Sequence, residues 1–245
     1  MRILPRRDFE LNELGWWANW AKLEWVAEDA YLLSSKELPE VFYNRGGLLS
    51  CSSIASLESI EEKLGASRAR PALMVFDSCR RATRILDSSG YLREDVMTVM
   101  AATGKRNDAA GVEVGRAKSA EVWAEAYLKA FYDDLGLLPT VRRIVKPLLG
   151  NGSTTLFEAK LDGEVAGTLA AYRTERMLGV YCVGTVPGFR RRGVADALLA
   201  RARELALTEG RTVILQSLES DGVVTFYLRR GFRVQYRKVL MTKKG

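Results

Sequence analysis

The sequence contains no histidine, and this absence excludes every mechanism that needs an imidazole ring. Ser-His-Asp and Cys-His catalysis, HExxH zinc chemistry and haem with a histidine ligand are therefore ruled out. Cysteine is scarce as well, because Cys51, Cys79 and Cys182 are too few for a four-thiolate zinc site and too scattered for a CxxC pair. We expect reduced thiols of an intracellular protein, with no disulfide and no metal.

Long apolar runs are also missing. The first ten residues, MRILPRRDFE, lack the apolar stretch of a signal peptide, and nowhere do 18 apolar residues follow one another. The sequence therefore predicts a cytoplasmic protein with no membrane partner.

The two halves of the chain differ in charge. Residues 1–110 hold 15 Lys and Arg against 16 Asp and Glu, whereas residues 111–245 hold 22 against 14. The basic half favours a polyanionic partner, such as nucleic acid, a membrane surface or a phosphorylated small molecule. A solvated basic surface would give the same composition, so both interpretations stay open.

A small, polar segment over 101–111 (AATGKRNDAAG) predicts a linker between two domains, 1–105 and 111–245. The chain pattern indicates an α/β protein, an α+β sandwich with a mixed, mainly antiparallel central sheet flanked by helices and a second, smaller α/β module at the N-terminus. Hydrophobic periodicity predicts helices over 11–27, 54–64, 79–87, 119–132, 140–149, 192–207 and 221–230. It predicts strands over 30–33, 47–51, 72–76, 96–100, 112–114, 155–161, 165–172, 178–186, 213–217 and 232–241.

Four of the five tryptophans fall in the predicted helix 11–27. At helical spacing these side chains favour a core or an interface over an acceptor platform or a nucleic-acid stacking surface. The segment 42–45 (FYNR) reads as an exposed aromatic and basic loop, either a contact loop for the acceptor or a plain turn. A short echo links Gly90-Tyr91 with Gly231-Phe232, since each pair follows a helix and precedes a hydrophobic strand, which predicts a structural repeat or a coincidence.

The strongest chemical signal is the segment 186–195 (VPGFRRRGVA), which joins a strand to a helix. Pro187 and Gly188 end the strand, while Gly193 and Ala195 keep the first helical turn free of bulky side chains. A helix N-terminus offers unpaired N–H groups and a partial positive charge, and three arginines add forked donors. The segment therefore predicts a pyrophosphate-binding turn, with a basic surface turn as the alternative.

Two motifs in order extend this signal. Arg190, Gly193 and Ala195 form R-x-x-G-x-A, and a later Y-x-x-x-G-F begins at Tyr227 and ends at Phe232. Together with the elements between them, they make residues 111–245 resemble the GNAT superfamily of N-acetyltransferases, whose consensus is R/Q-x-x-G-x-G/A. Neither a Walker A motif nor GxGxxG occurs, so nucleotide hydrolysis and Rossmann binding have no support.

The resemblance implies a GNAT-like fold and acetyl-CoA as co-substrate. The strand 178–186 would splay from its successor, so that its backbone pairs with the pantetheine amides, and the following N–H groups would hold the pyrophosphate. Thr185 stands where the family commonly has Val, and Ala195 replaces the second Gly. The implied cofactor-binding residues are Val183, Gly184, Thr185, Arg190, Arg191, Arg192, Gly193, Val194, Ala195 and Asp196.

The resemblance also implies that Tyr227 is the catalytic acid, because a phenol is neutral at pH 7 and can protonate the departing thiolate. A tyrosine that only packs on the last helix is the alternative. With no histidine, the base must be Asp, Glu or an ordered water. The candidates by neighbourhood, which we cannot rank, are Glu158, Glu175, Glu219 and Asp221.

The N-terminal half lacks the arginine-glycine turn and has Leu86 where a Tyr227 equivalent would stand, so it resembles a degenerate GNAT module of a tandem acetyltransferase. The implied activity is direct acetyl transfer to a primary amine, on a small molecule or a protein, in a ternary complex. An acyl-CoA-binding sensor and, less favoured, a basic nucleic-acid-binding module are the alternatives. The identity of the acceptor amine, the formation of a homodimer and the role of the N-terminal half stay open. Residues 107–245, if soluble, are expected to bind acetyl-CoA without the N-terminal half.

Overall fold

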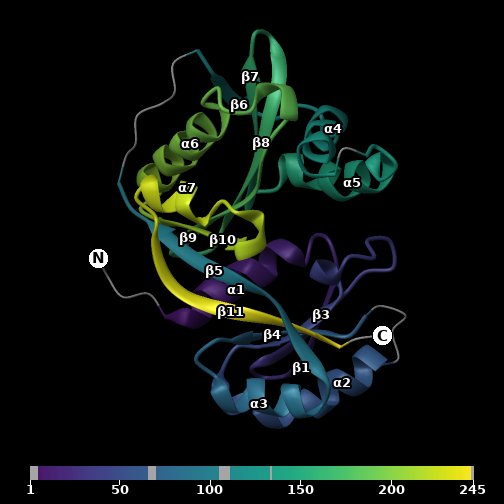
Figure 1. Cartoon of the computed structure of the whole chain (residues 1–245). Coiled ribbons are helices and arrows are strands. Elements are labelled where there is room, and N and C mark those ends of the chain that lie inside the picture. Colours follow the sequence, from purple (N-terminus) through teal and green to yellow (C-terminus); the bar gives the residue numbers. More distant parts are fainter. Residues whose placement is uncertain (1–4, 66–69, 105–110, 133, 244–245) are drawn as a thin grey trace. The chain divides into compact units, whose positions relative to one another are not determined.

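The computed structural model describes residues 5–65, 70–104, 111–132 and 134–243 (Figure 1). The chain forms two compact units, one of residues 1–101 and 216–245 and the other of residues 102–215. Among the described residues, no helix is long and apolar enough to cross a membrane.

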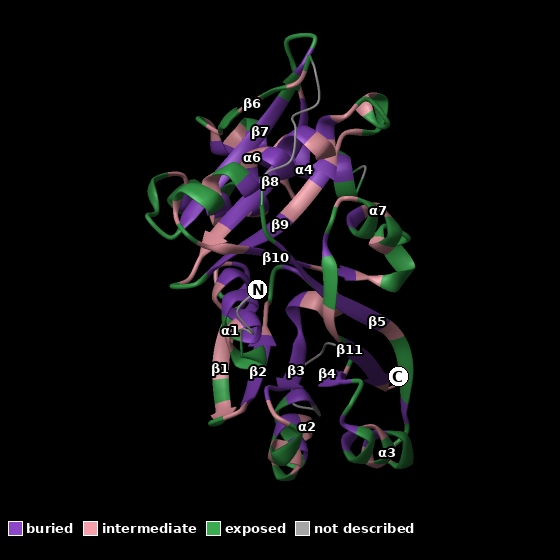
Figure 2. Cartoon of the chain, turned by 90° about the vertical axis from the view of Figure 1, so that its left-hand side faces the viewer, coloured by how far each residue is buried: buried purple, intermediate pink, exposed green. Residues whose placement is uncertain are grey.

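The first unit contains a sheet with the strand order β1-β2-β3-β4-β11-β5, in which β3 and β4 pair in parallel and the other neighbours are antiparallel. The strands are β1 (Lys22–Ala27), β2 (Ala30–Ser34), β3 (Arg45–Leu48), β4 (Ala72–Phe76), β5 (Tyr91–Ala102) and β11 (Arg233–Lys243). The helices are α1 (Arg6–Trp17), α2 (Leu57–Gly65), α3 (Arg80–Ser88) and α7 (Val224–Arg229), with the short 3-10 helices η1 (Val41–Tyr43), η2 (Cys51–Ser56) and η5 (Glu219–Asp221). Figure 2 shows that β2, β3 and β4 of this sheet are mostly buried, whereas β1, α2 and α3 have many exposed or half-buried residues.

The second unit has the strand order β10-β9-β8-β7-β6, with β9 and β10 parallel and the rest antiparallel. Its strands are β6 (Glu113–Arg116), β7 (Thr154–Leu161), β8 (Glu164–Arg173), β9 (Met177–Thr185) and β10 (Thr212–Leu218). Its helices are α4 (Ala120–Phe131), α5 (Leu138–Val145) and α6 (Val194–Thr208), with η3 (Lys146–Gly150) and η4 (Pro187–Phe189). Helix α6 covers one face of the sheet, and α4 and α5 cover the other (Figure 1). The prediction of mixed, mainly antiparallel pairing with flanking helices is confirmed.

The predicted helix over 11–27 is wrong in its second half. Helix α1 ends at Trp17, where the Asn19 side chain donates to the carbonyls of Gly15 and Trp16, and the chain then turns into strand β1. Trp16 is fully buried, whereas Trp25 is 45% exposed on β1. The helical spacing continued by chance, because pairing with β2 decided the conformation of residues 22–27. The expectation of a tryptophan core is confirmed for Trp16, Trp17 and Trp20, which are all buried.

The expectation of an exposed loop at 42–45 is also wrong. Tyr43, Asn44 and Arg45 are all buried, and Arg45 belongs to strand β3. The Asn44 amide donates to the carbonyl of Leu38 at 2.7 Å, and Arg45 Nη2 donates to Glu13 at 2.8 Å. These side chains therefore complete the core of the first unit and are not available as an acceptor contact.

Helix α1 buries two carboxylates against this unit. Lys238 Nζ lies 3.1 Å from Glu10 Oε2 and also bonds Glu13, and the Tyr236 hydroxyl donates to Glu10 at 2.6 Å. Burial raises the pKa of Glu10. With Arg45 on Glu13, two cations balance two carboxylates, which is the condition for keeping such charges inside a protein.

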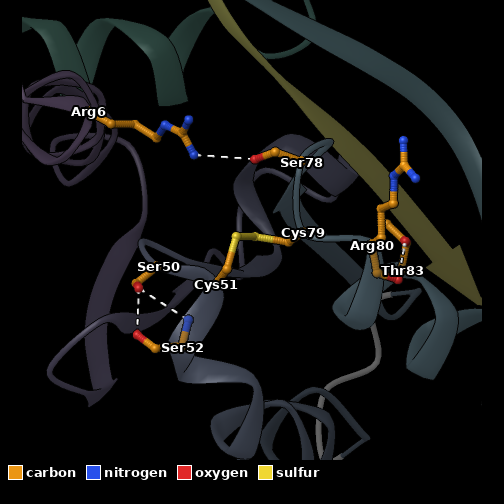
Figure 3. The surroundings of a disulfide bond; sticks show 8 residues. All are labelled: Arg6, Ser50, Cys51, Ser52, Ser78, Cys79, Arg80 and Thr83. Carbon is orange, nitrogen blue, oxygen red and sulfur yellow. Dashed lines mark hydrogen bonds between the residues drawn. A yellow bond between two sulfur atoms is a disulfide. The ribbon is translucent and has the colours of Figure 1, made fainter.

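The expectation of reduced thiols is wrong for two of the three cysteines. Cys51 in η2 and Cys79 at the N-cap of α3 form a disulfide, with their Cα atoms 5.4 Å apart (Figure 3). Only tertiary structure brings these segments together, because 28 residues separate the two cysteines. Cys182 is free. The cysteine argument for an intracellular protein therefore no longer holds.

The echo between the two glycine-aromatic pairs is a structural repeat. Gly90 and Gly231 both have left-handed backbones, with φ of +83° and +77°, and each follows a helix. Tyr91 and Phe232 are both buried. The strands that follow, β5 and β11, pair with each other in antiparallel fashion over most of their length.

The compact units differ from the predicted domain boundaries in one respect. Strand β11 lies between β4 and β5, so residues 216–245 belong to the first unit, although the boundaries 1–105 and 111–245 had placed them with the C-terminal half. Long-range pairing, which local patterns do not encode, causes this difference. The boundaries of independently folding domains stay a prediction.

Candidate functional site

Strands β9 and β10 pair only at their starts. The parallel register joins Thr212 to Met177 and Ile214 to Gly179, and it goes no further within the second unit. Strand β9 nevertheless continues to Thr185. Its backbone from residue 180 onward therefore presents an edge that β10 does not use in this unit.

A bulge lies in this part of β9. The register with β8 changes between the pairs Thr168 with Gly184 and Ala170 with Tyr181, and Cys182 has a positive φ of 52°. The Thr168 hydroxyl donates to the carbonyl of Cys182 at 3.1 Å and stabilises this conformation. A bulge re-aims the backbone groups beside it, so it alters which N–H and C=O groups of β9 face outward.

The segment after β9 is a turn that leaves the N-terminus of α6 open to a ligand. Arg191 and Gly193 both have left-handed backbones, with φ of +64° and +83°. Gly193 is the N-cap of α6 and no side chain caps the helix. The N–H groups of the first helical turn have no intrahelical partner and carry the positive end of the helix dipole. Successive N–H groups in such a turn form a concave anion-binding site.

The three arginines of the turn have different partners. Arg190 Nε donates to the carbonyl of Thr185 at 3.3 Å, and its Nη2 donates to the carbonyl of Ala130 at 3.1 Å. Arg192 pairs with Asp162 at 2.6 Å. The exposed Arg191 side chain has no ion pair or hydrogen bond within the described part of the chain. The Arg191 guanidinium is therefore the one best placed to meet an anion.

Two glycines, Gly184 and Gly167, allow close packing around the end of β9, and the sequence analysis did not predict this role. A Cβ on Gly184 would lie 2.6 Å from the Phe131 ring and 2.7 Å from the Cβ of Ala130, so α4 packs directly on the backbone of β9. A Cβ on Gly167 would lie 2.5 Å from the carbonyl oxygen of Gly184 and 2.7 Å from Val194. Glycine inside a predicted strand indicates such close approach, so the sequence pattern was sufficient to predict both packing positions.

Tyr227 lies on α7 in the first unit and is 8% exposed. Its ring packs edge-on against Phe226 and Phe232, with centroids 5.3 Å and 5.7 Å away. Burial and, to a smaller extent, the charge of Asp221 raise the pKa of Tyr227, and Arg230 lowers it, so that the pKa is about 12. The phenol is therefore a neutral proton donor at pH 7.

The two candidate bases of the second unit lie on different elements. Glu158 is buried on β7, 3.7 Å from Lys160. Glu175 is exposed in the turn between β8 and β9, at the opposite end of β9 from the arginine turn. Across the nine residues of β9 the two ends are separated by at most about 26–27 Å. Glu175 is therefore remote from that turn.

The two candidate bases of the first unit lie on η5. Glu219 accepts a hydrogen bond from the Thr98 hydroxyl and pairs with Arg237 at 3.2 Å. Asp221 accepts from the backbone N–H of Leu218 at 3.2 Å, and burial raises the pKa of Asp221. A carboxyl with a raised pKa is a stronger base, so the chemistry of Asp221 suits a general base.

Comparison with known proteins shows a similarity to one protein family. Residues 152–234 match the model of the Acetyltransferase (GNAT) domain. A GCN5-related N-acetyltransferase from Kribbella flavida has the same fold with a TM-score of 0.73 and 17% identity, over 98% of this chain and 96% of that one. One from Sphaerobacter thermophilus gives a TM-score of 0.64 and 19% identity, over 92% and 83%. No curated protein matches the sequence.

A tandem GNAT protein from the clavulanic acid biosynthesis pathway is similar as well, with a TM-score of 0.62 and 12% identity over 87% of this chain and 77% of that one. Residues 152–234 thus match the GNAT acetyltransferase domain model, and the fold similarity to GNAT proteins extends over nearly the whole chain. The matched residues contain both sequence motifs, from Arg190 to Phe232.

Proposed function

We propose that the protein is an acetyl-CoA-dependent N-acetyltransferase that transfers an acetyl group to a primary amine by direct attack in a ternary complex. The observation that carries this proposal is the uncapped N-terminus of α6, reached through the left-handed Arg191 and Gly193 directly after the open edge of β9. This order supplies amide partners and an anion site next to each other along the chain.

The residues present fit acetyl-CoA. The backbone of Val183, Gly184 and Thr185 would pair with the pantetheine amides as an added strand does. The N–H groups of residues 191–196 and the Arg191 guanidinium would hold the pyrophosphate. Arg190 supports this turn by binding two backbone carbonyls. The side chain of Arg192 is engaged by Asp162, so its part in binding is assigned to its backbone.

Acetyl-CoA supplies the thioester. The amine nitrogen forms a bond to the carbonyl carbon, the carbon–sulfur bond breaks, the amine loses a proton to a base and the sulfur gains one. We assign the donation to sulfur to Tyr227, which stays protonated at neutral pH because its pKa is raised to about 12. Burial raises the pKa of the Cys182 thiol, so Cys182 is a poor nucleophile and direct transfer needs no cysteine adduct.

The test is acetyl-CoA turnover with a panel of amines, followed by detection of the released thiol. Amine-dependent thiol release supports the proposal. Acetyl-CoA binding by calorimetry without turnover for any amine would favour the acyl-CoA sensor. Binding to nucleic acid that weakens steeply with salt, without acetyl-CoA binding, would favour a basic nucleic-acid-binding module.

We further propose that residues 1–105 are a degenerate GNAT-like module that binds no cofactor. Leu86 is buried on α3 at the position that corresponds to Tyr227 in the structural repeat. The arginine-glycine turn has no counterpart in this part of the sequence. A stoichiometry of one acetyl-CoA per chain is expected from calorimetry, and a stoichiometry of two would contradict the proposal.

A further inference from the structure

The second unit contains an open cavity of about 770 Å³, and four of its lining residues are basic. It is lined by Lys118, Ala120, Pro139, Arg142, Arg143, Lys146, Pro147 and Leu149. Half of the lining residues are therefore cations, and none is an acid or an aromatic residue.

The packing of α5 explains why these cations gather. Val141 and Val145 are buried toward the core of the unit, so the intervening Arg142 and Arg143 and the following Lys146 project outward. Lys118 approaches from the segment before α4. Amphipathic spacing on one short helix thus concentrates positive charge at one place.

Part of this charge is compensated. Arg142 pairs with Glu121 at 2.8 Å. In the described ranges, Lys118 and Lys146 make neither a hydrogen bond nor an ion pair. Cations that share a cavity repel one another, and an anion that enters it removes this cost.

The cavity is distinct from the turn assigned to acetyl-CoA. That turn contacts the C-terminal end of α4, where the carbonyl of Ala130 accepts from Arg190. The cavity lies at Ala120, the first residue of the helix. Ten residues of α-helix separate the two positions, which corresponds to about 15 Å.

We propose that this cavity binds a small molecule that carries a phosphate ester or polyphosphate with at least two negative charges. Arginine forks and lysine ammonium groups are the side chains that bind phosphate oxygens. The apolar residues between them suit the carbon part of such a molecule. The lining offers no aromatic ring for base stacking, which argues against a single-stranded nucleic acid. Ser119 already caps α4, so binding is assigned to the side chains.

Lysine footprinting tests this site directly. The protein is labelled with an amine-reactive ester and analysed by mass spectrometry, with tripolyphosphate as the probe and with sodium chloride at equal ionic strength as the reference. At saturating probe, the labelling rates of Lys118 and Lys146 should fall at least fivefold. Lys22 and Lys160, which are exposed elsewhere, should be unchanged. The segment 185–196 contains no lysine, so phosphate bound there does not produce this signal.

A matched pair of variants gives a second readout. A Lys118→Ala/Lys146→Ala variant should bind tripolyphosphate at least tenfold more weakly at this site, whereas Lys160→Ala should bind as the unchanged protein does. Both variants should keep their thermal transition, because all three lysines are exposed. Equal protection of all four lysines, no protection, or protection by single-stranded RNA alone would overturn the proposal. Failure of acetyl-CoA binding would leave this result unaffected, since the two sites use different residues.

Discussion

The guanidinium of Arg190 donates a 3.1 Å hydrogen bond to the carbonyl of Ala130, at the C-terminal end of α4. That carbonyl is among the last four of the helix, which lack intrahelical partners and carry the negative end of the dipole. The same guanidinium holds the carbonyl of Thr185, the last residue of β9. Arg190 therefore ties a strand end and a helix end to the turn, whereas Arg191 beside it has no such partner in the part of the chain that the structure describes.

Alanine substitution of Arg190 and of Arg191 should separate a role in stability from a role in acetyl-CoA binding. Arg190→Ala should lower the free energy of unfolding by about 1–2 kcal/mol, because two backbone carbonyls lose a charged donor. Arg191→Ala should change stability by less than about 0.5 kcal/mol but weaken acetyl-CoA binding at least tenfold. Urea unfolding and calorimetry measure both quantities. Equal effects of the two variants on binding and stability would contradict this division.

Gly193→Val should abolish acetyl-CoA binding while the fold survives. Gly193 has a φ of +83°, which a β-branched residue strongly disfavours, and a side chain there would obstruct the helix end. Gly188→Ala is the matched control, since a Cβ at that position meets nothing within 4 Å and should leave affinity unchanged. An unaltered affinity in folded Gly193→Val would remove the turn from the proposed site.

Tyr227→Phe should slow turnover roughly 100-fold or more while acetyl-CoA affinity is nearly kept. The ring contacts with Phe226 and Phe232 persist, so stability should change little. Since burial raises the pKa of Tyr227 to about 12, the phenol stays protonated up to pH 9, and its ionisation should cause no loss of wild-type activity below that pH. A variant that turns over at the wild-type rate from pH 6 to 9 would make Tyr227 structural.

Reduction of the Cys51–Cys79 disulfide should destabilise the first unit. The bond closes a loop across 28 residues, and the chain-entropy estimate for such a loop is about 3–4 kcal/mol. Urea unfolding with and without reductant measures the loss, with thiol titration as the check on the redox state. Cys51→Ser should match the reduced protein and should not respond to reductant. A response of that variant would assign the effect to something other than this disulfide.

The fragment 107–245 should be poorly soluble, which differs from the expectation that it would bind acetyl-CoA alone. It retains β11 but removes both neighbours of that strand, β4 and β5. Val239, Leu240 and Met241, which are buried in the chain, would then lie on an unpaired strand. Size-exclusion chromatography and circular dichroism test this. A monomeric, folded fragment that binds acetyl-CoA would instead support the domain boundary at residues 105–111.

The sequence by itself determined the features that short segments encode. The arginine-glycine turn, its strand and its helix were predicted because Pro, Gly and hydrophobic periodicity act within a few residues. A glycine and an aromatic residue between a helix and a strand were predicted twice for the same reason, at Gly90 and Gly231, and both glycines have a left-handed backbone. These features depend on local backbone sterics, and the surroundings alter them little.

Only the tertiary structure decided the partners of distant residues. Lys238 meets Glu10 across more than 200 positions, Cys51 meets Cys79, and β11 inserts between β4 and β5. Residues 22–27 became a strand through pairing with β2, against their helical spacing. Burial and pairing free energies depend on what the chain brings together in space, and these outweigh the small local propensities wherever the two conflict.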